Sequence, residues 1–327
     1  GDIDLKNMAH AYVLRSPHAN AKIISIDINK AQESPGVLLV LTGEDYLSSG
    51  LGNMTCHSIN PMLAGEHPVV QKPHGALVHS TVKCVGARVA LVVADTLEQA
   101  KDASELIEVE YEILSSIITA KQARESKSQM VWEETDNNIA FVYKIGNELG
   151  AEVAINNAVN VIQATISNNR VNTNAMEPRT SIGIYEKGDR KYTLYSGNQG
   201  PNRVREELAK EILNVPEARL QVISPDVGGG FGMKGGAYGE DILVLWAAKL
   251  IDRPVKWAGE RIESFMSDSH GRDVIADCKM AFDSNARITA LRVSADYNVG
   301  AYLSHSAGIS PMFFSVLLSG FLKTIFI

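Results

Sequence analysis

The stretch DVGGGFGMKGG, residues 226–236, decides how the rest of the chain is interpreted. Six glycines fall between Gly228 and Gly236, and the stretch lies between a predicted strand at 220–224 and a predicted helix at 238–251. Glycine permits positive φ and lets the backbone come close to a ligand. Successive exposed amides before a helix suit anions or polar rings. A ligand-free turn is the other interpretation, which the entropic cost of so many glycines disfavours.

Two nucleotide-binding motifs are further alternatives. Residues 230–235 match G-x-G-x-x-G, but a dinucleotide site also needs an acidic residue about twenty positions later on a second strand. The nearest candidate, Glu260, lies in a polar turn. In a P-loop the lysine is followed by Ser or Thr, whereas Lys234 is followed by Gly235. A nicotinamide-dependent dehydrogenase therefore rests only on a weak glycine match.

Hydrophobic periodicity outside the loop predicts an α/β (α+β) protein with a domain at 1–120, a polar linker at 121–146 and a second domain at 147–327. In the first domain it predicts strands at 9–15, 22–28, 37–41, 88–94 and 108–113, and helices at 29–33 and 97–107. In the second it predicts strands at 161–170, 180–186, 190–196, 220–224, 273–282 and 288–298, and helices at 201–213 and 238–251. The runs at 37–41 and 88–94 are continuously apolar, which is typical of strands buried on both faces.

Composition excludes several classes of protein. The 327 residues carry a net charge of -7, without the concentrated Lys and Arg that nucleic-acid binding needs. Cys56, Cys84 and Cys278 are scattered, so they predict neither a disulfide framework nor a metal site of this chain's own. The apolar stretch 309–327 is interrupted by polar residues, so we expect no membrane span. No signal peptide opens the chain, which favours a cytoplasmic protein.

A family resemblance rests on six stretches that occur in the right order. They are GGGFGMK at 228–234, LRSPHANAKI at 14–23, EYE at 110–112, the segment 172–179 ending in MEPR, NQGP at 198–201 and DSHGRD at 268–273. Together they resemble the large, molybdopterin-binding subunit of the molybdenum hydroxylases, the family of xanthine dehydrogenase, aldehyde oxidase and aerobic carbon monoxide dehydrogenase. The resemblance extends over nearly the whole chain. It implies an α/β hammerhead domain followed by the first half of a molybdopterin-binding domain.

The resemblance also implies roles for particular residues. The Gln199 side chain would bond to the apical oxo ligand of molybdenum. The backbone of Gly229, Gly230, Phe231 and Gly232 would lie against the metal–pterin unit, with Phe231 beside the substrate cavity. The structural alternatives are that Gln199 only caps backbone amides at the start of a helix and that Phe231 is an ordinary core aromatic. No side chain would ligate the metal.

Four other residues of the matching stretches are open to two interpretations. Glu177 and Arg179 either orient the loop through a charge-assisted pair or are purely structural. His270 and Arg272 are either part of the site or strand-edge residues without a role.

By the same resemblance, the parent protein hydroxylates an aldehyde or an N-heterocycle with oxygen from water. Its electrons would leave through 2Fe-2S and FAD centres on partner subunits, in a cytoplasmic dimer of heterotrimers, and its pterin would be the cytosine dinucleotide form. Gly235 stands where purine-specific members have glutamate, which disfavours xanthine as substrate. We expect the chain to be a fragment without the segment that supplies the catalytic glutamate, and so nearly inactive alone. A non-catalytic remnant or assembly module is the alternative.

Overall fold

The computed structural model describes residues 1–56, 69–126, 129–304 and 321–326. The chain forms two compact units, and neither is continuous in sequence. The first unit combines residues 1–54, 73–116 and 173–269, and the second combines residues 55–72, 117–172 and 270–327.

A seven-stranded sheet is the centre of the first unit. Its strands, in spatial order, are β11 (Leu220–Ile223), β10 (Lys191–Ser196), β9 (Thr180–Glu186), β12 (Val255–Ala258), β1 (Ala9–Arg15), β5 (Arg88–Ala94) and β3 (Val37–Thr42). The predicted hairpin is confirmed, since β9 and β10 pair antiparallel. Strands β1 and β12 pair in parallel, with Ala9 opposite Val255. One sheet therefore contains strands from both of the regions that the sequence separates.

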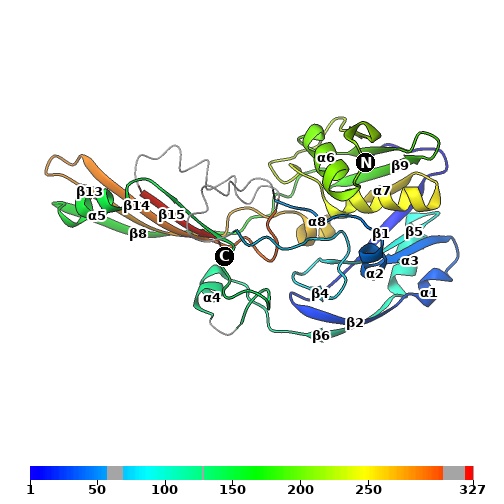
Figure 1. Cartoon of the computed structure of the whole chain (residues 1–327), viewed down its shortest axis with the longest axis horizontal. Helices are drawn as coiled ribbons and strands as arrows, with labels where there is room; N and C mark the ends of the chain where they lie inside the picture. The colour runs from blue at the N-terminus through cyan, green and yellow to red at the C-terminus, as the bar shows by residue number, and fades with distance from the viewer. Residues whose placement is uncertain (57–68, 127–128, 305–320, 327) are drawn as a thin grey trace. The chain divides into compact units, whose positions relative to one another are not determined.

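Helix α7 (Gly239–Ile251) packs on this sheet against β9 and β12 (Figure 1). In the first turn of α7, the Asp241 carboxylate accepts a hydrogen bond from the Tyr238 N–H. The helix ends at Asp252, which has a left-handed φ of 54°. Residues 242–248 are all buried, which suits a helix that is apolar around most of its circumference. The predicted helix at 238–251 is confirmed to within one residue.

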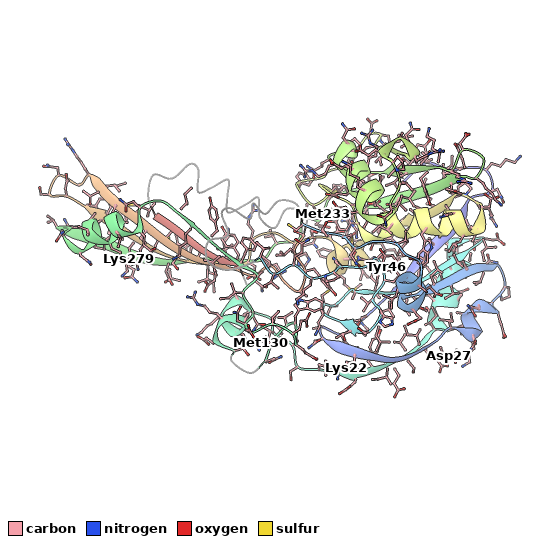
Figure 2. The ribbon with its side chains drawn as sticks, in the orientation of Figure 1. Lys22, Asp27, Tyr46, Met130, Met233 and Lys279 are labelled. Atoms are coloured by element: carbon pink, nitrogen blue, oxygen red, sulfur yellow. The ribbon has the colours of Figure 1, made fainter. Side chains whose placement is uncertain are left out.

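The edge of the first unit carries short helices and a small sheet. The strands, in order, are β4 (Thr81–Val82), β2 (Ala21–Asp27) and β6 (Glu108–Ile113), and the helices are α1 (Asn29–Gln32), α2 (Gly43–Ser48) and α3 (Leu97–Glu105). Tyr46 of α2 lies edge-to-face against Trp246 of α7, and its position is labelled in Figure 2. Strand β5 is buried throughout, as predicted. The prediction that β3 is buried on both faces is wrong, because β3 is an edge strand and Leu38 is 37% exposed.

The predicted helix at 201–213 has two parts. Helix α6 (Pro201–Glu207) begins with proline in its first turn and continues as a π-helical turn, Leu208–Ile212. A 3-10 turn, Glu217–Arg219, then leads into β11. Helix α8 (Arg261–Ser267) follows β12 and was not predicted.

The second unit is built on a five-stranded sheet, with α5 (Glu148–Asn156) packed on it. The strand order is β7 (Phe141–Ile145), β15 (Phe321–Phe326), β14 (Ile288–Tyr297), β13 (Val274–Phe282) and β8 (Asn160–Asn168). The stretch predicted as a linker, 121–146, contains all but the first residue of α4 (Ala120–Glu125) and the whole of β7. The Thr119 hydroxyl accepts from the Gln122 N–H at the start of α4, and Phe141 to Tyr143 are buried. Local capping and one short apolar run thus structure a mostly polar segment.

Among the described residues, no helix combines the length and the apolar character needed to cross a membrane. Strand β15 is the only part of the apolar stretch 309–327 that the structure describes. The rest of that stretch lies outside the described residues.

Candidate functional site

The glycine loop, residues 226–236, connects β11 to α7. Three residues of the loop have positive φ: Gly229 at 100°, Phe231 at 49° and Gly232 at 84°. Positive φ is easy for glycine but rare for an aromatic residue, and such outliers cluster at functional sites. Phe231 is also 76% exposed. Its interpretation as a core aromatic is therefore wrong.

Gln199, just before α6, contacts this loop. Its side-chain oxygen accepts a hydrogen bond from the Gly232 N–H at 2.8 Å. Its backbone N–H donates to the Lys234 carbonyl, also at 2.8 Å. A Cβ on Gly230 would lie 2.5 Å from the Gln199 side-chain Cδ, so this position needs glycine for the close approach. The structure thus brings together Gln199, Gly230 and Gly232. The interpretation of Gln199 as a helix cap is wrong, because its side chain bonds to the loop.

Some hydrogen-bond donors at this turn have no protein acceptor. Within the ranges that the structure describes, neither the Gly230 N–H nor the Phe231 N–H has one, and the side-chain NH₂ of Gln199 also donates to nothing. A Cβ on Gly232 would meet no atom within 4 Å, so space is open beside the turn. The turn therefore offers neighbouring donors to the oxygen and nitrogen atoms of a polar ligand.

Lys234 and Glu177 form an ion pair that contacts the backbone of the loop. The Lys234 side chain is 1% exposed, and its ammonium donates to the Glu177 carboxylate at 3.0 Å and to the Glu177 carbonyl at 2.9 Å. The same carboxylate accepts from the Gly228 N–H at 2.8 Å. Burial alone would raise the pKa of Glu177, but the Gly228 amide and the Lys234 ammonium outweigh it and hold that pKa below its ordinary value. Glu177 therefore contacts the loop, and its charged partner is Lys234 rather than Arg179.

Arg179 belongs to a separate buried cluster of charges. Its guanidinium donates to Asp268 and to Glu240, both at 2.7 Å, and lies 3.8 Å from the centre of the Tyr238 ring. Glu240 is 0% exposed and also accepts from Arg15 at 2.6 Å. Burial would raise the pKa of Glu240, but the surrounding arginines lower it well below its ordinary value. The cluster joins β1, the residue before β9, the first turn of α7 and the residue after α8.

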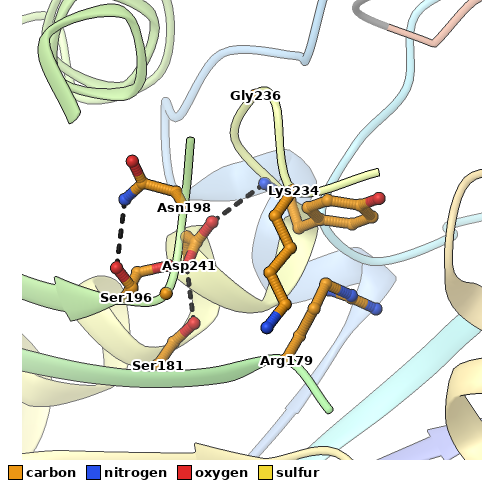
Figure 3. A pocket seen from close by; sticks show the side chains of 9 residues that line it. Arg179, Ser181, Ser196, Asn198, Lys234, Gly236 and Asp241 are labelled. Atoms are coloured by element: carbon orange, nitrogen blue, oxygen red, sulfur yellow. Dashed lines mark hydrogen bonds between the residues drawn. The ribbon is translucent and has the colours of Figure 1, made fainter. Parts of the chain in front are cut away.

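A small polar pocket lies beside these groups (Figure 3). It is lined by Arg179, Ser181, Ser196, Gly197, Asn198, Lys234, Gly236, Tyr238 and Asp241. Figure 3 shows the hydrogen bond from the Ser181 hydroxyl to Asp241 and the one from the Asn198 amide to the Ser196 carbonyl. Gln199 and Phe231 do not line this pocket.

The remaining sequence candidates play other parts. His270 and Arg272 precede β13 in the second unit. Glu260 begins α8 and pairs with Lys101. Strands β11 and β12, on either side of α7, are separated in the sheet by β10 and β9, so they do not form the βαβ unit that a dinucleotide site requires. Within the described part of the chain, no three His, Cys, Asp or Glu side chains gather closely enough to hold a metal ion.

Sequence reasoning missed Lys234, Glu240 and Arg15 as members of this arrangement. Two signals were available. Glu240 is an acidic residue in the first turn of a helix whose following residues are apolar, and Arg15 belongs to the RSPHA segment. Neither signal says which residue is the partner.

Two family models match the chain. Residues 131–321 match the molybdopterin cofactor-binding domain, and residues 1–115 match the a/b hammerhead domain of aldehyde oxidase and xanthine dehydrogenase. The first match covers the glycine loop, Gln199, Glu177 and Lys234.

Several known proteins are similar over most of the chain. The nicotine 6-hydroxylase large subunit of Paenarthrobacter nicotinovorans is 32% identical over 302 residues, covering 92% of this chain and 36% of the relative. The carbon monoxide dehydrogenase large chain of Afipia carboxidovorans is 31% identical over 313 residues, covering 92% and 37%. The crystal structure of quinoline 2-oxidoreductase from Pseudomonas putida 86 superposes with a TM-score of 0.90 at 29% identity, covering 99% of this chain and 41% of that one. This chain therefore spans little more than a third of the length of these curated relatives.

The glycine loop and Gln199 lie within the cofactor-binding match, and the preceding residues match the hammerhead domain. This chain therefore belongs to the molybdopterin-binding large-subunit family of the molybdenum hydroxylases.

Proposed function

We propose that the loop 226–236 and Gln199 bind the molybdenum–molybdopterin cofactor in a subunit of an oxidoreductase that hydroxylates an aldehyde or an N-heterocycle. The observation that carries the proposal is the 2.8 Å hydrogen bond between Gln199 and Gly232, which places a glutamine side chain against an exposed glycine turn.

The residues present fit such a cofactor. A molybdopterin has a polar ring system, a phosphate and oxygen ligands on its metal, all of which accept hydrogen bonds. The N–H groups of Gly230 and Phe231 and the side-chain NH₂ of Gln199, which have no acceptor among the described residues, are donors of the matching kind. The open space beside Gly232 leaves room for a flat group to approach the backbone. When bound, the cofactor supplies the redox centre that transfers oxygen from water to carbon.

Each residue of the proposed site then has a defined role. The Gln199 oxygen holds the loop through Gly232, which leaves its NH₂ to donate to an oxygen of the cofactor. The backbone of Gly229, Gly230, Phe231 and Gly232 lies against the ring system. The exposed Phe231 ring provides an apolar surface for the substrate. Such a site works by positioning and electrostatics, while the cofactor carries the redox chemistry.

The finer features of the proposal rest on the family. Relatives are named for nicotine and quinoline, which are N-heterocycles, and Gly235 replaces the glutamate of purine-specific members. Relatives named as a large subunit, a large chain and a subunit of a complex support partner subunits. We assign 2Fe-2S and FAD centres to those partners, the cytosine dinucleotide to the pterin, and the cytoplasm and a dimer of heterotrimers to the assembly.

The test is the metal and pterin content of the chain after expression in cells that make the cofactor. We expect molybdenum and pterin to copurify in a one-to-one ratio with each other. Gly230→Ala should lower both several-fold, because the new Cβ would lie 2.5 Å from the Gln199 side chain. Gly188→Ala is the matched control, since a Cβ there meets nothing within 4 Å. Wild-type protein with less than about a tenth of an equivalent of molybdenum would point to a non-catalytic module instead, because cofactor chemistry needs a bound cofactor.

A further inference from the structure

Lys234, in the glycine loop, has a side chain that is only 1% exposed. Its ammonium binds both the carboxylate and the carbonyl of Glu177, while its own carbonyl accepts from the Gln199 N–H at 2.8 Å. One residue thus connects three segments: the segment at 177, the segment at 199 and the end of the loop. These segments are far apart in sequence, so nothing local fixes their arrangement.

Glu177 fixes the other end of the loop. Its carboxylate accepts from the Gly228 N–H at 2.8 Å, and its own N–H donates to the Gly228 carbonyl at 3.1 Å. A Cβ on Gly228 would lie 2.5 Å from Cβ of Glu177, so the two backbones are in close contact. The Glu177–Lys234 pair therefore holds both Gly228, before the strained turn, and Lys234, after it.

Burial of a lysine ammonium is costly unless it is paired and hydrogen-bonded. The hydrogen bonds to Glu177 offset that cost, and they join residues at the two ends of the turn. The residues between the two anchors include Gly229, Phe231 and Gly232, all with positive φ, and strained backbone persists only where its surroundings over-determine it. The ion pair and the Gln199–Gly232 hydrogen bond are long-range contacts that surround this turn.

We infer that Glu177 and Lys234 are positioning residues, which hold the strained turn and Gln199 in the arrangement that receives the cofactor before the cofactor binds. Neither side chain needs to touch the cofactor. The inference rests on the proposed function for what the turn receives, but the holding of the turn is a property of the empty chain and can be tested without the cofactor.

The experiment is hydrogen exchange of the full chain without cofactor, followed residue-resolved or by peptides covering 226–236. Glu177→Ala removes the acceptor of the Gly228 N–H and the partner of Lys234. We expect exchange in the loop to rise about tenfold or more, as for the loss of a hydrogen bond to a charged group. Glu177→Gln keeps an acceptor for Gly228 and should recover part of the protection.

Glu217→Ala is the matched control. The Glu217 side chain is 33% exposed, close to the 29% of Glu177, and it also pairs with a lysine, Lys210, at 3.1 Å. We expect no change in loop exchange for this variant. Residues 242–248 of α7 report on the fold as a whole and should keep their protection in all three variants.

Cofactor occupancy is the second readout. Molybdenum content should fall several-fold in Glu177→Ala, less in Glu177→Gln and not at all in Glu217→Ala. Unchanged loop exchange in Glu177→Ala would overturn the inference, and so would an equal loss of protection in the loop and in α7, because the pair would then merely stabilise the fold. Wild-type protein without molybdenum would refute the proposed function, while loop exchange would still decide whether the pair holds the turn.

Discussion

The side-chain oxygen of Gln199 accepts a hydrogen bond from the Gly232 N–H at 2.8 Å, across 33 positions of sequence. The glutamine thus uses its side-chain oxygen as an acceptor within the protein, and in the described part of the chain its side-chain NH₂ has no acceptor. This division of roles separates what holds the loop from what would contact the cofactor.

Gln199→Glu tests that division. A glutamate keeps an acceptor for the Gly232 N–H but has no NH₂ to donate. We expect unchanged thermal stability and a several-fold loss of molybdenum content, measured by metal analysis of the purified chain. Gln199→Ala removes both functions and should also lower the free energy of unfolding by about 1 kcal/mol, the usual worth of one hydrogen bond. Equal molybdenum content in Gln199→Glu and wild type would show that the donor is not needed.

Phe231→Gly tests the strain in the turn. Phe231 has φ of 49° and is 76% exposed, so glycine relieves the left-handed conformation while little buried surface is lost. We expect the free energy of unfolding to rise by up to about 1 kcal/mol, the scale of the αL cost for a residue with a side chain. Urea denaturation measures it. A clear loss of stability would mean that the Phe231 ring packs more than its exposure indicates.

Glu240→Gln tests the buried charge cluster. Glu240 is 0% exposed and lies within 2.6 Å of Arg15, 2.7 Å of Arg179 and 3.8 Å of Arg88. Removal of its charge takes away the carboxylate nearest to buried Arg88, while Arg15 keeps Glu263 and Arg179 keeps Asp268. Loss of one partner from a buried charge pair typically costs about 3–5 kcal/mol of stability. Glu206→Gln, in the exposed pair with Lys210, should leave the denaturation midpoint almost unchanged. Similar denaturation midpoints for the two variants would contradict a stabilising role of the cluster.

Asp241→Asn tests the sign of one pH dependence. Burial raises the pKa of Asp241 above its ordinary value, so its protonated form favours folding at low pH, and that advantage is lost as pH rises through the folded-state pKa. Asparagine cannot ionise and loses nothing. We therefore expect the stability of wild type relative to Asp241→Asn to fall as the pH rises from about 4 to about 7.

The stability that Glu240 contributes depends on pH with the opposite sign. Although burial opposes it, the arginines lower the pKa of Glu240, so its contribution is present above the unfolded-state pKa and is lost only as pH falls through the much lower folded-state value. Denaturation curves at several pH values separate the two residues. A constant difference between wild type and Asp241→Asn across that range would contradict the raised pKa.

Local patterns predicted much of the fold. Strands β1 and β5 and helix α7 follow from runs and periodicities that lie within a few residues of each other, and the glycine loop is visible as composition alone. The parallel pairing of β1 with β12 joins residues about 250 positions apart, which no local pattern reports. Edge position, which exposes Leu38 of β3, is likewise a property of the assembled sheet.

The candidate site divides in the same way. Gln199 and the loop residues were predicted through a family resemblance, and the structure places Gln199 on the loop. The pairing of Lys234 with Glu177 and of Arg15 with Glu240 depends on which segments pack together. A charged residue in a sequence shows that a partner is needed if it is buried, but only the fold shows which one.

The most direct test is a crystal structure of the chain purified with its cofactor. We expect pterin density against the backbone of Gly230 and Phe231, with the Gln199 NH₂ donating to an oxygen of the cofactor and Gly232 still bonded to Gln199. Cofactor bound elsewhere on the chain, with the loop 226–236 facing solvent, would contradict the assignment.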